Sequence, residues 1–283
     1  ILEHPEIAAV SFVGSTPIAR YIYETGTKNG KRVQALGGAK NHIVAMPDAV
    51  HEQSVPNIAE SAFGNAGQRC LAGSVLTLVG DADKKLLPRL IDHVASIKMG
   101  RGLDEGIGLG PVIRGEARDR VHRLVDEGIA AGGEMIRDGR GTGPEKGFFI
   151  GPTIVGIDAA SPLAREEVFG PVLSVVEVDT LADAIAFING SRYGNGTSIF
   201  TESGAAVRRY RHEIEVGMIG VNVGVAAPVA FFPFSGWKDS FLGDLHAHGT
   251  DGVDFFTRKK TVTSRWFSDG QTGKFFVEHG DAS

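Results

Sequence analysis

The chain has 283 residues, of which 42% are hydrophobic and 22% charged, so it is long enough to bury a large core. Its 29 basic and 34 acidic side chains give a net charge of −5, which excludes a basic surface for nucleic acid or an anionic membrane. The single cysteine excludes a disulfide framework and a cysteine-based zinc site. Of the nine histidines, His246 and His248 form an H-x-H pair without a third ligand, so we expect no metal site. No apolar stretch approaches the ~18 residues of a transmembrane helix, and we expect a protein of a reducing compartment, the cytoplasm or alternatively the mitochondrial matrix.

Strand-like apolar segments alternate with helical stripes along the chain. The expected strands cover residues 8–14, 43–46, 75–79, 172–178, 197–200, 218–223 and 260–266. The expected helices cover residues 17–24, 53–63, 87–94, 121–129 and 205–216, and one more begins at residue 181. This alternation predicts an α/β fold with a mainly parallel sheet that helices cover on both faces.

Local signals mark some of the boundaries between these elements. Thr180 and Asp183 have the spacing of a capping box at the start of a helix. The Gly132-Gly133 pair is expected to close the helix that precedes it. Residues 136–147 are polar and rich in glycine, which predicts an exposed loop.

Cys70 is the first candidate for chemistry. A lone cysteine is most often a small buried hydrophobe. Here Gly64 and Gly67, which have no side chains, leave space around it, and Arg69 places a cation next to it in the sequence. A neighbouring cation favours the thiolate, which is the nucleophilic form. The residues alone therefore leave two interpretations open, a buried filler and a nucleophile.

Two other segments have the residue types of a nucleotide site. Ser15 and Thr16 stand between a strand and a helix, where backbone N–H groups and a hydroxyl suit a phosphate, although an ordinary helix cap is the alternative. Glu166 and Glu167 precede Phe169, so a carboxylate for a ribose diol would stand beside an aromatic ring that packs on a flat ligand. The alternative for this acidic pair is a solvated turn before a strand.

Three segments together resemble the aldehyde dehydrogenase superfamily, and the resemblance covers about residues 5–267. Residues 12–16 resemble the pyrophosphate-binding turn of that family. Residues 63–70, FGNAGQRC, resemble its nucleophile signature, and residues 166–172, EEVFGPV, resemble its nicotinamide-ribose motif. The order and the separations of the three segments match as well, which makes the resemblance specific.

The resemblance implies roles for individual residues. Cys70 would be the catalytic nucleophile, and its backbone N–H would provide half of an oxyanion site. Ser15, Glu167 and Phe169 would contact NAD. Arg69 would bind the carboxylate of an acidic substrate, although an arginine before the nucleophile also occurs in relatives with neutral substrates.

One departure from the family narrows the implied reaction. Typical members have a Glu-Leu-Gly-Gly-Lys segment whose glutamate is the general base for hydrolysing the thioester. Aligned without a gap on Lys40, this chain has Leu36 at the glutamate position, and leucine cannot take a proton from water. This loss, together with residues 193–197 and 220–223, is similar to the methylmalonate-semialdehyde (malonate-semialdehyde) dehydrogenase branch. The implied function is oxidation of (methyl)malonate semialdehyde to an acyl-CoA, with NAD reduction and coenzyme A as acceptor from a Cys70 thioester.

The resemblance also implies a division of the chain, which looks like the C-terminal half of the family. Residues 1–38 would end the NAD-binding domain, 39–250 form the catalytic domain, 251–267 hold an oligomerisation strand, and 268–283 form a tail. A homo-oligomer, a dimer or tetramer, is expected for the full-length protein, because an exposed edge strand seeks a partner. The isolated chain is expected to be inactive and to bind NAD poorly. Two alternatives stay open: an inactive short paralogue that acts as a binding or assembly subunit, and a hydrolytic semialdehyde dehydrogenase.

Overall fold

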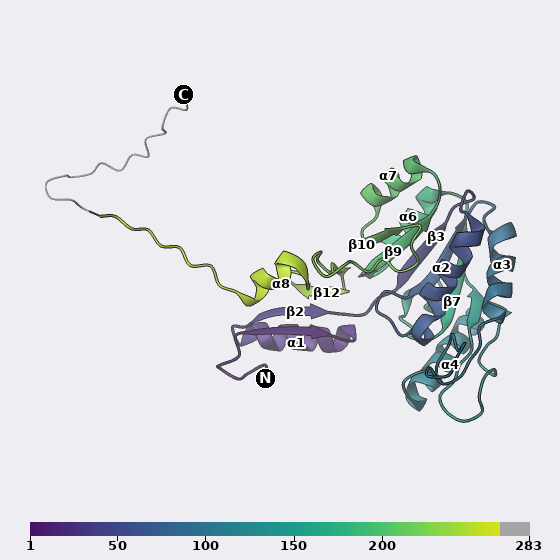
Figure 1. Cartoon of the computed structure of the whole chain (residues 1–283), viewed down its shortest axis with the longest axis horizontal. Coiled ribbons are helices and arrows are strands. Elements are labelled where there is room, and N and C mark those ends of the chain that lie inside the picture. The colour runs from purple at the N-terminus through teal and green to yellow at the C-terminus, as the bar shows by residue number, and fades with distance from the viewer. Residues whose placement is uncertain (267–283) are drawn as a thin grey trace.

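A computed structural model describes residues 1–266 of the chain, and its larger part is built on a seven-stranded sheet (Figure 1). The strand order is β10 (Met218–Val221), β9 (Gly196–Phe200), β3 (Asn41–Ala45), β4 (Gly73–Val79), β7 (Val172–Val178), β6 (Thr153–Gly156) and β5 (Glu134–Arg137). All neighbours in this sheet are parallel except β5, which runs antiparallel to β6. The mainly parallel sheet predicted from the sequence is therefore confirmed.

Helices cover both faces of this sheet. One face packs against α2 (His51–Phe63) and α3 (Asp83–Ala95). The other packs against α4 (Gly115–Ala130), the short α5 (Pro162–Arg165), α6 (Leu181–Asn189) and α7 (Gly204–Glu213). Within residues 1–266 no helix combines the length and the apolar character that crossing a membrane requires.

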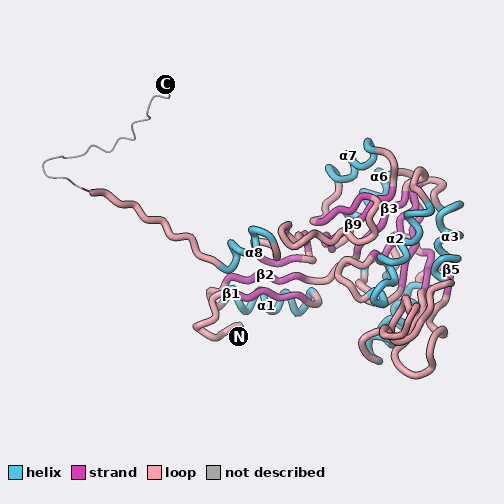
Figure 2. Tube along the Cα trace, in the orientation of Figure 1, coloured by secondary structure: helices cyan, strands magenta, loops and turns pink. Residues whose placement is uncertain are grey.

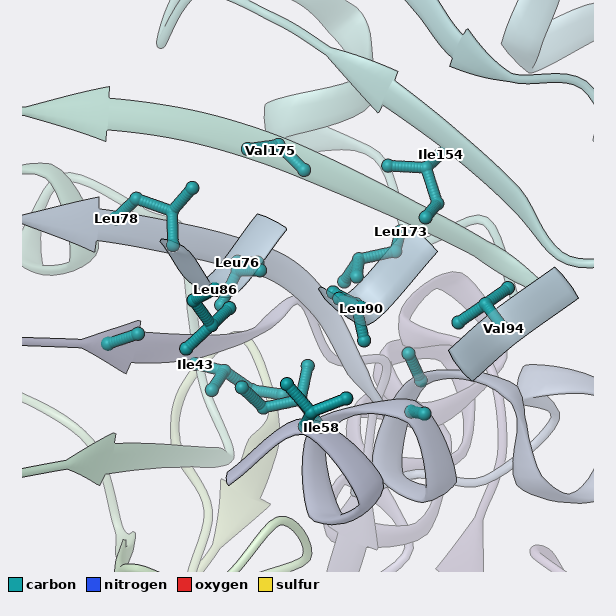
Figure 3. Close-up of a cluster of buried hydrophobic side chains, with 14 of the residues drawn as sticks. Ile43, Ile58, Leu76, Leu78, Leu86, Leu90, Val94, Ile154, Leu173 and Val175 are labelled. Carbon is teal, nitrogen blue, oxygen red and sulfur yellow. The ribbon is translucent and has the colours of Figure 1, made fainter. Parts of the chain in front are cut away.

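The alternation of side chains along β4 explains why both faces need a cover. Leu76 and Leu78 point into the cluster beneath α2 and α3, where they meet Leu86 and Leu90 (Figure 3). Val75, which precedes Leu76 and points to the opposite face, joins the core under α4. A strand that is apolar on both sides in this way is typical of the central strands of a parallel sheet.

A smaller, three-stranded sheet precedes the large one along the chain. Its strands β1 (Ala9–Val13) and β2 (Arg32–Leu36) are parallel and are joined by α1 (Thr16–Lys28). Its third strand, β12 (Phe241–Gly243), returns from the far end of the chain to pair antiparallel with β2. The change of sheet thus falls close to the predicted boundary at residue 38, and the domain division itself stays a prediction.

Two of the local signals have the expected geometry. The Thr180 hydroxyl accepts a hydrogen bond from the Asp183 N–H at 3.2 Å, while the Asp183 carboxylate accepts one from the Thr180 N–H at 3.1 Å. Gly132 has a left-handed φ of 97° directly after α4. The capping box and the glycine-terminated helix are therefore confirmed.

Six of the strands in the described part of the chain were not predicted from the sequence. Those missed are β2, β5, β6, β12 and the antiparallel pair of β8 (Tyr193–Gly194) and β11 (Trp237–Lys238). They have two to five residues each, and strands this short are found from the sequence only where they form a continuous apolar run, as β3 does. Because β5 ends at Arg137, the expected loop at 136–147 begins two residues too early.

The strand expected at residues 260–266 was wrong for this chain on its own. After α8 (Gly249–Phe256), residues 257–266 form neither helix nor strand and extend away from both sheets (Figure 2). A run of β-branched residues becomes a strand only when another strand offers hydrogen-bond partners. The oligomerisation role of residues 251–267 remains a prediction, and the tail at 268–283 lies outside the described residues.

Candidate active site

A cavity of about 620 Å³ lies where the small sheet meets the large one. The β1–α1 turn, the glycines after β2, the loop that carries Cys70, the start of α4 and the segment before β7 all line it. Ser15, Cys70, Glu167 and Phe169 are among its lining residues, whereas Arg69 is not. The structure therefore brings together four of the five site residues that the sequence singled out.

The cysteine loop is built on an irregular turn after α2. Its first part, η1 (Gly64–Gly67), contains Asn65 and Ala66 at left-handed φ values of 53° and 54°. The carbonyl of Cys70 then accepts hydrogen bonds from the side-chain amides of Asn41 at 2.9 Å and Asn195 at 2.8 Å. Two side-chain amides, one from β3 and one from the residue directly before β9, thus fix the backbone at the nucleophile.

The thiol of Cys70 is exposed to the cavity, which excludes a buried filler. Partial burial of the sulfur nevertheless raises the pKa of Cys70, and the Glu167 carboxylate acts in the same direction. The backbone N–H groups of Cys70 and Leu71, followed by the Arg69 guanidinium, act to lower this pKa and are outweighed. Arg69 therefore favours the thiolate, as its adjacency in the sequence suggests, but burial has the larger effect on this pKa.

Glu167 rests on the segment that follows β2. Its carboxylate accepts a hydrogen bond from the N–H of Ala39 at 3.0 Å. Burial raises the pKa of Glu167, against the opposing effect of that hydrogen bond and of two cations, Arg120 and Lys40. The neighbouring Glu166 is exposed and does not line the cavity, so the solvated-turn interpretation fits Glu166 but not Glu167.

Phe169 presents its ring at the edge of the cavity. Its side chain is 44% exposed, and its backbone has a left-handed φ of 53°. Arg120 of α4 holds this turn, because its guanidinium donates to the carbonyls of Glu167 at 2.7 Å and Val168 at 2.6 Å. An exposed aromatic ring held in an uncommon backbone conformation is typical of a ligand contact.

Ser15 occupies the N-cap position of α1 with an extended backbone, yet its hydroxyl caps no N–H group. Thr16 makes the structural hydrogen bonds instead. Its hydroxyl accepts one from the N–H of Gly38 at 2.9 Å and donates one to the carbonyl of Asp239 at 3.3 Å. Ser15 therefore lines the cavity directly before the N-terminus of α1, and its hydroxyl makes no capping hydrogen bond.

The Arg69 guanidinium lies against the end of α2 and lines a smaller pocket to which Glu167 and Phe169 also contribute. Its guanidinium pairs with the Glu60 carboxylate at 3.2 Å and also donates to the carbonyls of Glu60 and Ser61. In this conformation the guanidinium is occupied by its contacts with the end of α2. Binding of a substrate carboxylate would require Arg69 to leave them. The sequence held no clear signal of this, since Glu60 lies nine residues before Arg69.

Several residues of the site were missed by sequence reasoning. Lys40 and Asn41 stand in the segment matched to the family, but no role had been given to them beyond alignment. Asn195 belongs to the matched residues 193–197, so its presence was noted without its hydrogen bond to the cysteine loop. Arg120 sits in a helix with many charges, where nothing distinguishes it in the sequence.

The structure also shows where Leu36, at the position of the family's glutamate base, and His246 of the histidine pair lie. Leu36 is 5% exposed within β2 and does not line the cavity. His246 contacts the carbonyl of Gly236 at 3.1 Å through Nε2, and its Nδ1 lies 3.6 Å from Asp251. No group of three or more potential metal-binding side chains occurs in the part of the chain that the structure describes.

The chain is similar in sequence to curated bacterial proteins. The chain is 52% identical over 269 residues to malonate-semialdehyde dehydrogenase 2 of Bacillus thuringiensis (strain Al Hakam), covering 94% of the chain and 55% of that protein. It is 48% identical over 268 residues to malonate-semialdehyde dehydrogenase of Halalkalibacterium halodurans, with the same coverage. The chain thus spans about half the length of the relatives it matches.

Solved structures give the same picture. The methylmalonate-semialdehyde dehydrogenase of Oceanimonas doudoroffii superposes with a TM-score of 0.92 at 45% identity, over 95% of this chain and 56% of that one. A 1-pyrroline-5-carboxylate dehydrogenase from Thermus, solved with bound NAD, superposes with a TM-score of 0.83 at 29% identity, over 90% of this chain and 50% of that one. The profile of the aldehyde dehydrogenase family matches residues 1–262. The chain therefore belongs to the aldehyde dehydrogenase family.

Proposed function

We propose that the full-length protein containing this sequence is an NAD-dependent, CoA-acylating dehydrogenase of malonate semialdehyde or methylmalonate semialdehyde. The observation that carries the proposal is the shared cavity of Cys70, Glu167, Phe169 and Ser15. The names of the relatives supply the substrate class. Leu36 at the position of the hydrolytic base favours coenzyme A over water as the acceptor.

The residues that line the cavity fit the nicotinamide end of NAD. The Glu167 carboxylate offers hydrogen-bond acceptors for ribose hydroxyls, and the exposed ring of Phe169 offers a flat surface for packing. Ser15 and the N-terminus of the 13-residue helix α1 suit a phosphate. When bound, NAD accepts the hydride that leaves the substrate carbon.

The chain's own part in the reaction centres on Cys70. After losing its proton, the sulfur adds to the aldehyde carbon and forms a thiohemiacetal, whose oxidation leaves an acyl thioester on Cys70. The thiol of coenzyme A then attacks the thioester carbon, and Cys70 leaves as a thiolate. A thiol ionises with a pKa of about 8.5, whereas bulk water has a pKa of about 15.7, so this acceptor needs far less help from a protein base.

The hydrolytic alternative has one observation in its favour. Glu167 lines the same cavity as Cys70, and burial raises its pKa, so its carboxylate is a candidate base for a water molecule. The alternative of an inactive binding or assembly subunit has no comparable support, because the thiol is open to the cavity. Measured products decide among the three.

Product analysis with and without coenzyme A tests the proposal. We expect the full-length enzyme to reduce NAD with (methyl)malonate semialdehyde and to form acyl-CoA only when coenzyme A is present. Chromatography of the products and absorbance of NADH at saturating aldehyde provide the measurement. Free acid formed at a comparable rate without coenzyme A would instead support the hydrolytic enzyme, and no turnover at all would support the inactive subunit.

Arg69 remains our proposal for the substrate carboxylate, which requires the side chain to leave Glu60. We then expect Arg69→Leu to raise the KM for the semialdehyde by about 10-fold or more, since a charge-assisted pair contributes roughly 1.5 to 3 kcal/mol. Propanal, which has no carboxylate, serves as the control substrate and should be affected little. An equal change in KM for both aldehydes would show that Arg69 acts only through its contacts with α2.

Two further properties are proposed for the full-length protein. Residues 257–266, which form neither helix nor strand, are a candidate for pairing with a second subunit, which supports a homo-oligomer. The relatives named above are bacterial, which favours the cytoplasm over the mitochondrial matrix.

A further inference from the structure

The described chain buries two lysines, and their surroundings differ. Lys31 is 7% exposed, and its ammonium donates to the carbonyls of His4 and Ile7 at 2.6 and 2.7 Å. Lys40 is 3% exposed, and its Nζ atom has no hydrogen-bond partner among residues 1–266. A buried ammonium without partners is costly to the fold. A structural role alone therefore accounts for Lys31 but not for Lys40.

Lys40 follows directly the two residues on which the Glu167 carboxylate rests. The N–H of Ala39 donates to one carboxylate oxygen at 3.0 Å. A β-carbon added at Gly38 would lie 2.8 Å from the other oxygen, so the backbone there is in close contact with the acid. Lys40 is thus the buried cation behind a carboxylate whose other side faces the cavity of Cys70.

The charged and titratable groups that face Lys40 come from three places in the fold. Glu167 and Glu166 approach from the segment before β7, Arg120 from α4, and His42 from β3. Burial lowers the pKa of His42 to about 3, so this ring is neutral above about pH 4.

Lys40 itself changes charge near neutrality. Burial lowers the pKa of Lys40 to about 7, an effect that Glu167 and Glu166 reduce and Arg120 enhances. Below that pH, the positive charge of Lys40 and the negative charge of Glu167 cancel, although the two groups make no direct ion pair. Above it, the neutral amine leaves the carboxylate with one uncompensated negative charge beside the cavity.

We propose that Lys40 is a positioning residue that acts through Glu167. Its ammonium neutralises the charge of the Glu167 carboxylate at the cofactor end of the cavity. When Lys40 releases its proton, that end of the cavity favours the oxidised, cationic nicotinamide. The proposal rests on the proposed NAD-dependent function. NAD carries one more positive charge than NADH on its nicotinamide ring. Loss of a positive charge nearby therefore strengthens NAD binding relative to NADH binding. For unit charges about 10 Å apart at an effective dielectric constant of about 20, the ratio changes by about tenfold.

The coupling of these two charges is tested first in the 283-residue chain. With lysines labelled with ¹³C at Cε, one lysine signal should titrate near pH 7 while the others titrate near their ordinary values. Glu167→Gln removes the largest stabilising charge and should move this titration to lower pH. Glu166→Gln, at an exposed position, should move it less. A chain in which every lysine titrates above pH 9, or in which Glu167→Gln leaves the signal unmoved, would overturn the coupling.

Cofactor binding to the full-length enzyme tests the consequence. The ratio of the Kd for NADH to the Kd for NAD should rise about tenfold between pH 6 and pH 8.5. Lys40→Met should make the ratio independent of pH, whereas Lys31→Met should leave its pH dependence as in the wild type. Persistence of the pH dependence in Lys40→Met overturns the inference. Failure of the wild type to bind NAD overturns the proposed function as well, and the lysine titration then shows whether the coupling exists without it.

Discussion

Cys70→Ala should abolish acyl-CoA formation by the full-length enzyme, lowering kcat by at least about 10⁴-fold. Without the sulfur, neither the thiohemiacetal nor the thioester can form, and these 283 residues contain no other cysteine that could replace it. Because Cys70 is exposed and its backbone carbonyl keeps both amide donors in the variant, the unfolding free energy should change by less than about 0.5 kcal/mol. NADH absorbance and thermal unfolding provide the two measurements. Turnover within tenfold of the wild type would contradict the role of Cys70.

The same thiol gives a pH dependence of known sign. Since partial burial raises the pKa of Cys70 above its ordinary value, the thiolate fraction at pH 7 is lower than in a free thiol and rises as the pH passes through the raised pKa. We expect alkylation of the 283-residue chain by iodoacetamide to modify one site and to have its midpoint at a higher pH than that of a free thiol such as N-acetylcysteine. Glu167→Gln should move this midpoint down, because it removes a negative charge that opposes the thiolate. A midpoint below pH 8 in the wild type would show that another group activates the thiol.

The sequence predicted the large sheet well because its central strands are long and apolar. Strand β7 agrees with the expected residues 172–178, and α6 begins at the residue its capping box indicated. Such elements are specified by local pattern and by burial on two faces. Strand β12 could not be found in this way, because its three residues form a strand only through their pairing with β2, some two hundred residues earlier.

The site shows the same division. Ser15, Cys70, Glu167 and Phe169 could be found because each stands in a segment with a distinctive spacing. Lys40 could not be found in this way, because what distinguishes it is a buried ammonium without a hydrogen-bond partner, and burial depends on the tertiary structure. The contacts of Arg69 could not be predicted for the same reason: adjacency in the sequence places a cation next to Cys70, but only the fold shows that its guanidinium pairs with Glu60.

Gly67→Ala is expected to have the largest effect on the architecture of the site. Gly67 has a left-handed φ of 66°, and a β-carbon there would lie 2.1 Å from the carbonyl oxygen of Gly170. The cysteine loop and the segment before β7 approach each other at this point, so the methyl group must push them apart. The left-handed backbone costs about 1 to 2 kcal/mol and the overpacking about 1 to 3 kcal/mol, which together predict a loss of about 2 to 5 kcal/mol in unfolding free energy.

Two other glycines separate these causes. Gly106 has a similar φ of 74° with nothing within 4 Å of its added β-carbon, so Gly106→Ala should show the backbone cost alone, about 1 to 2 kcal/mol. Gly102 has neither feature, and Gly102→Ala should change the unfolding free energy by less than about 0.5 kcal/mol. Displacement of Cys70 relative to Glu167 should also lower kcat about 100-fold in Gly67→Ala and leave it unchanged in both controls. Equal stability and activity of Gly67→Ala and Gly106→Ala would mean that the two segments are free to separate, and the close packing of the cysteine loop on Gly170 would then not be what positions the nucleophile.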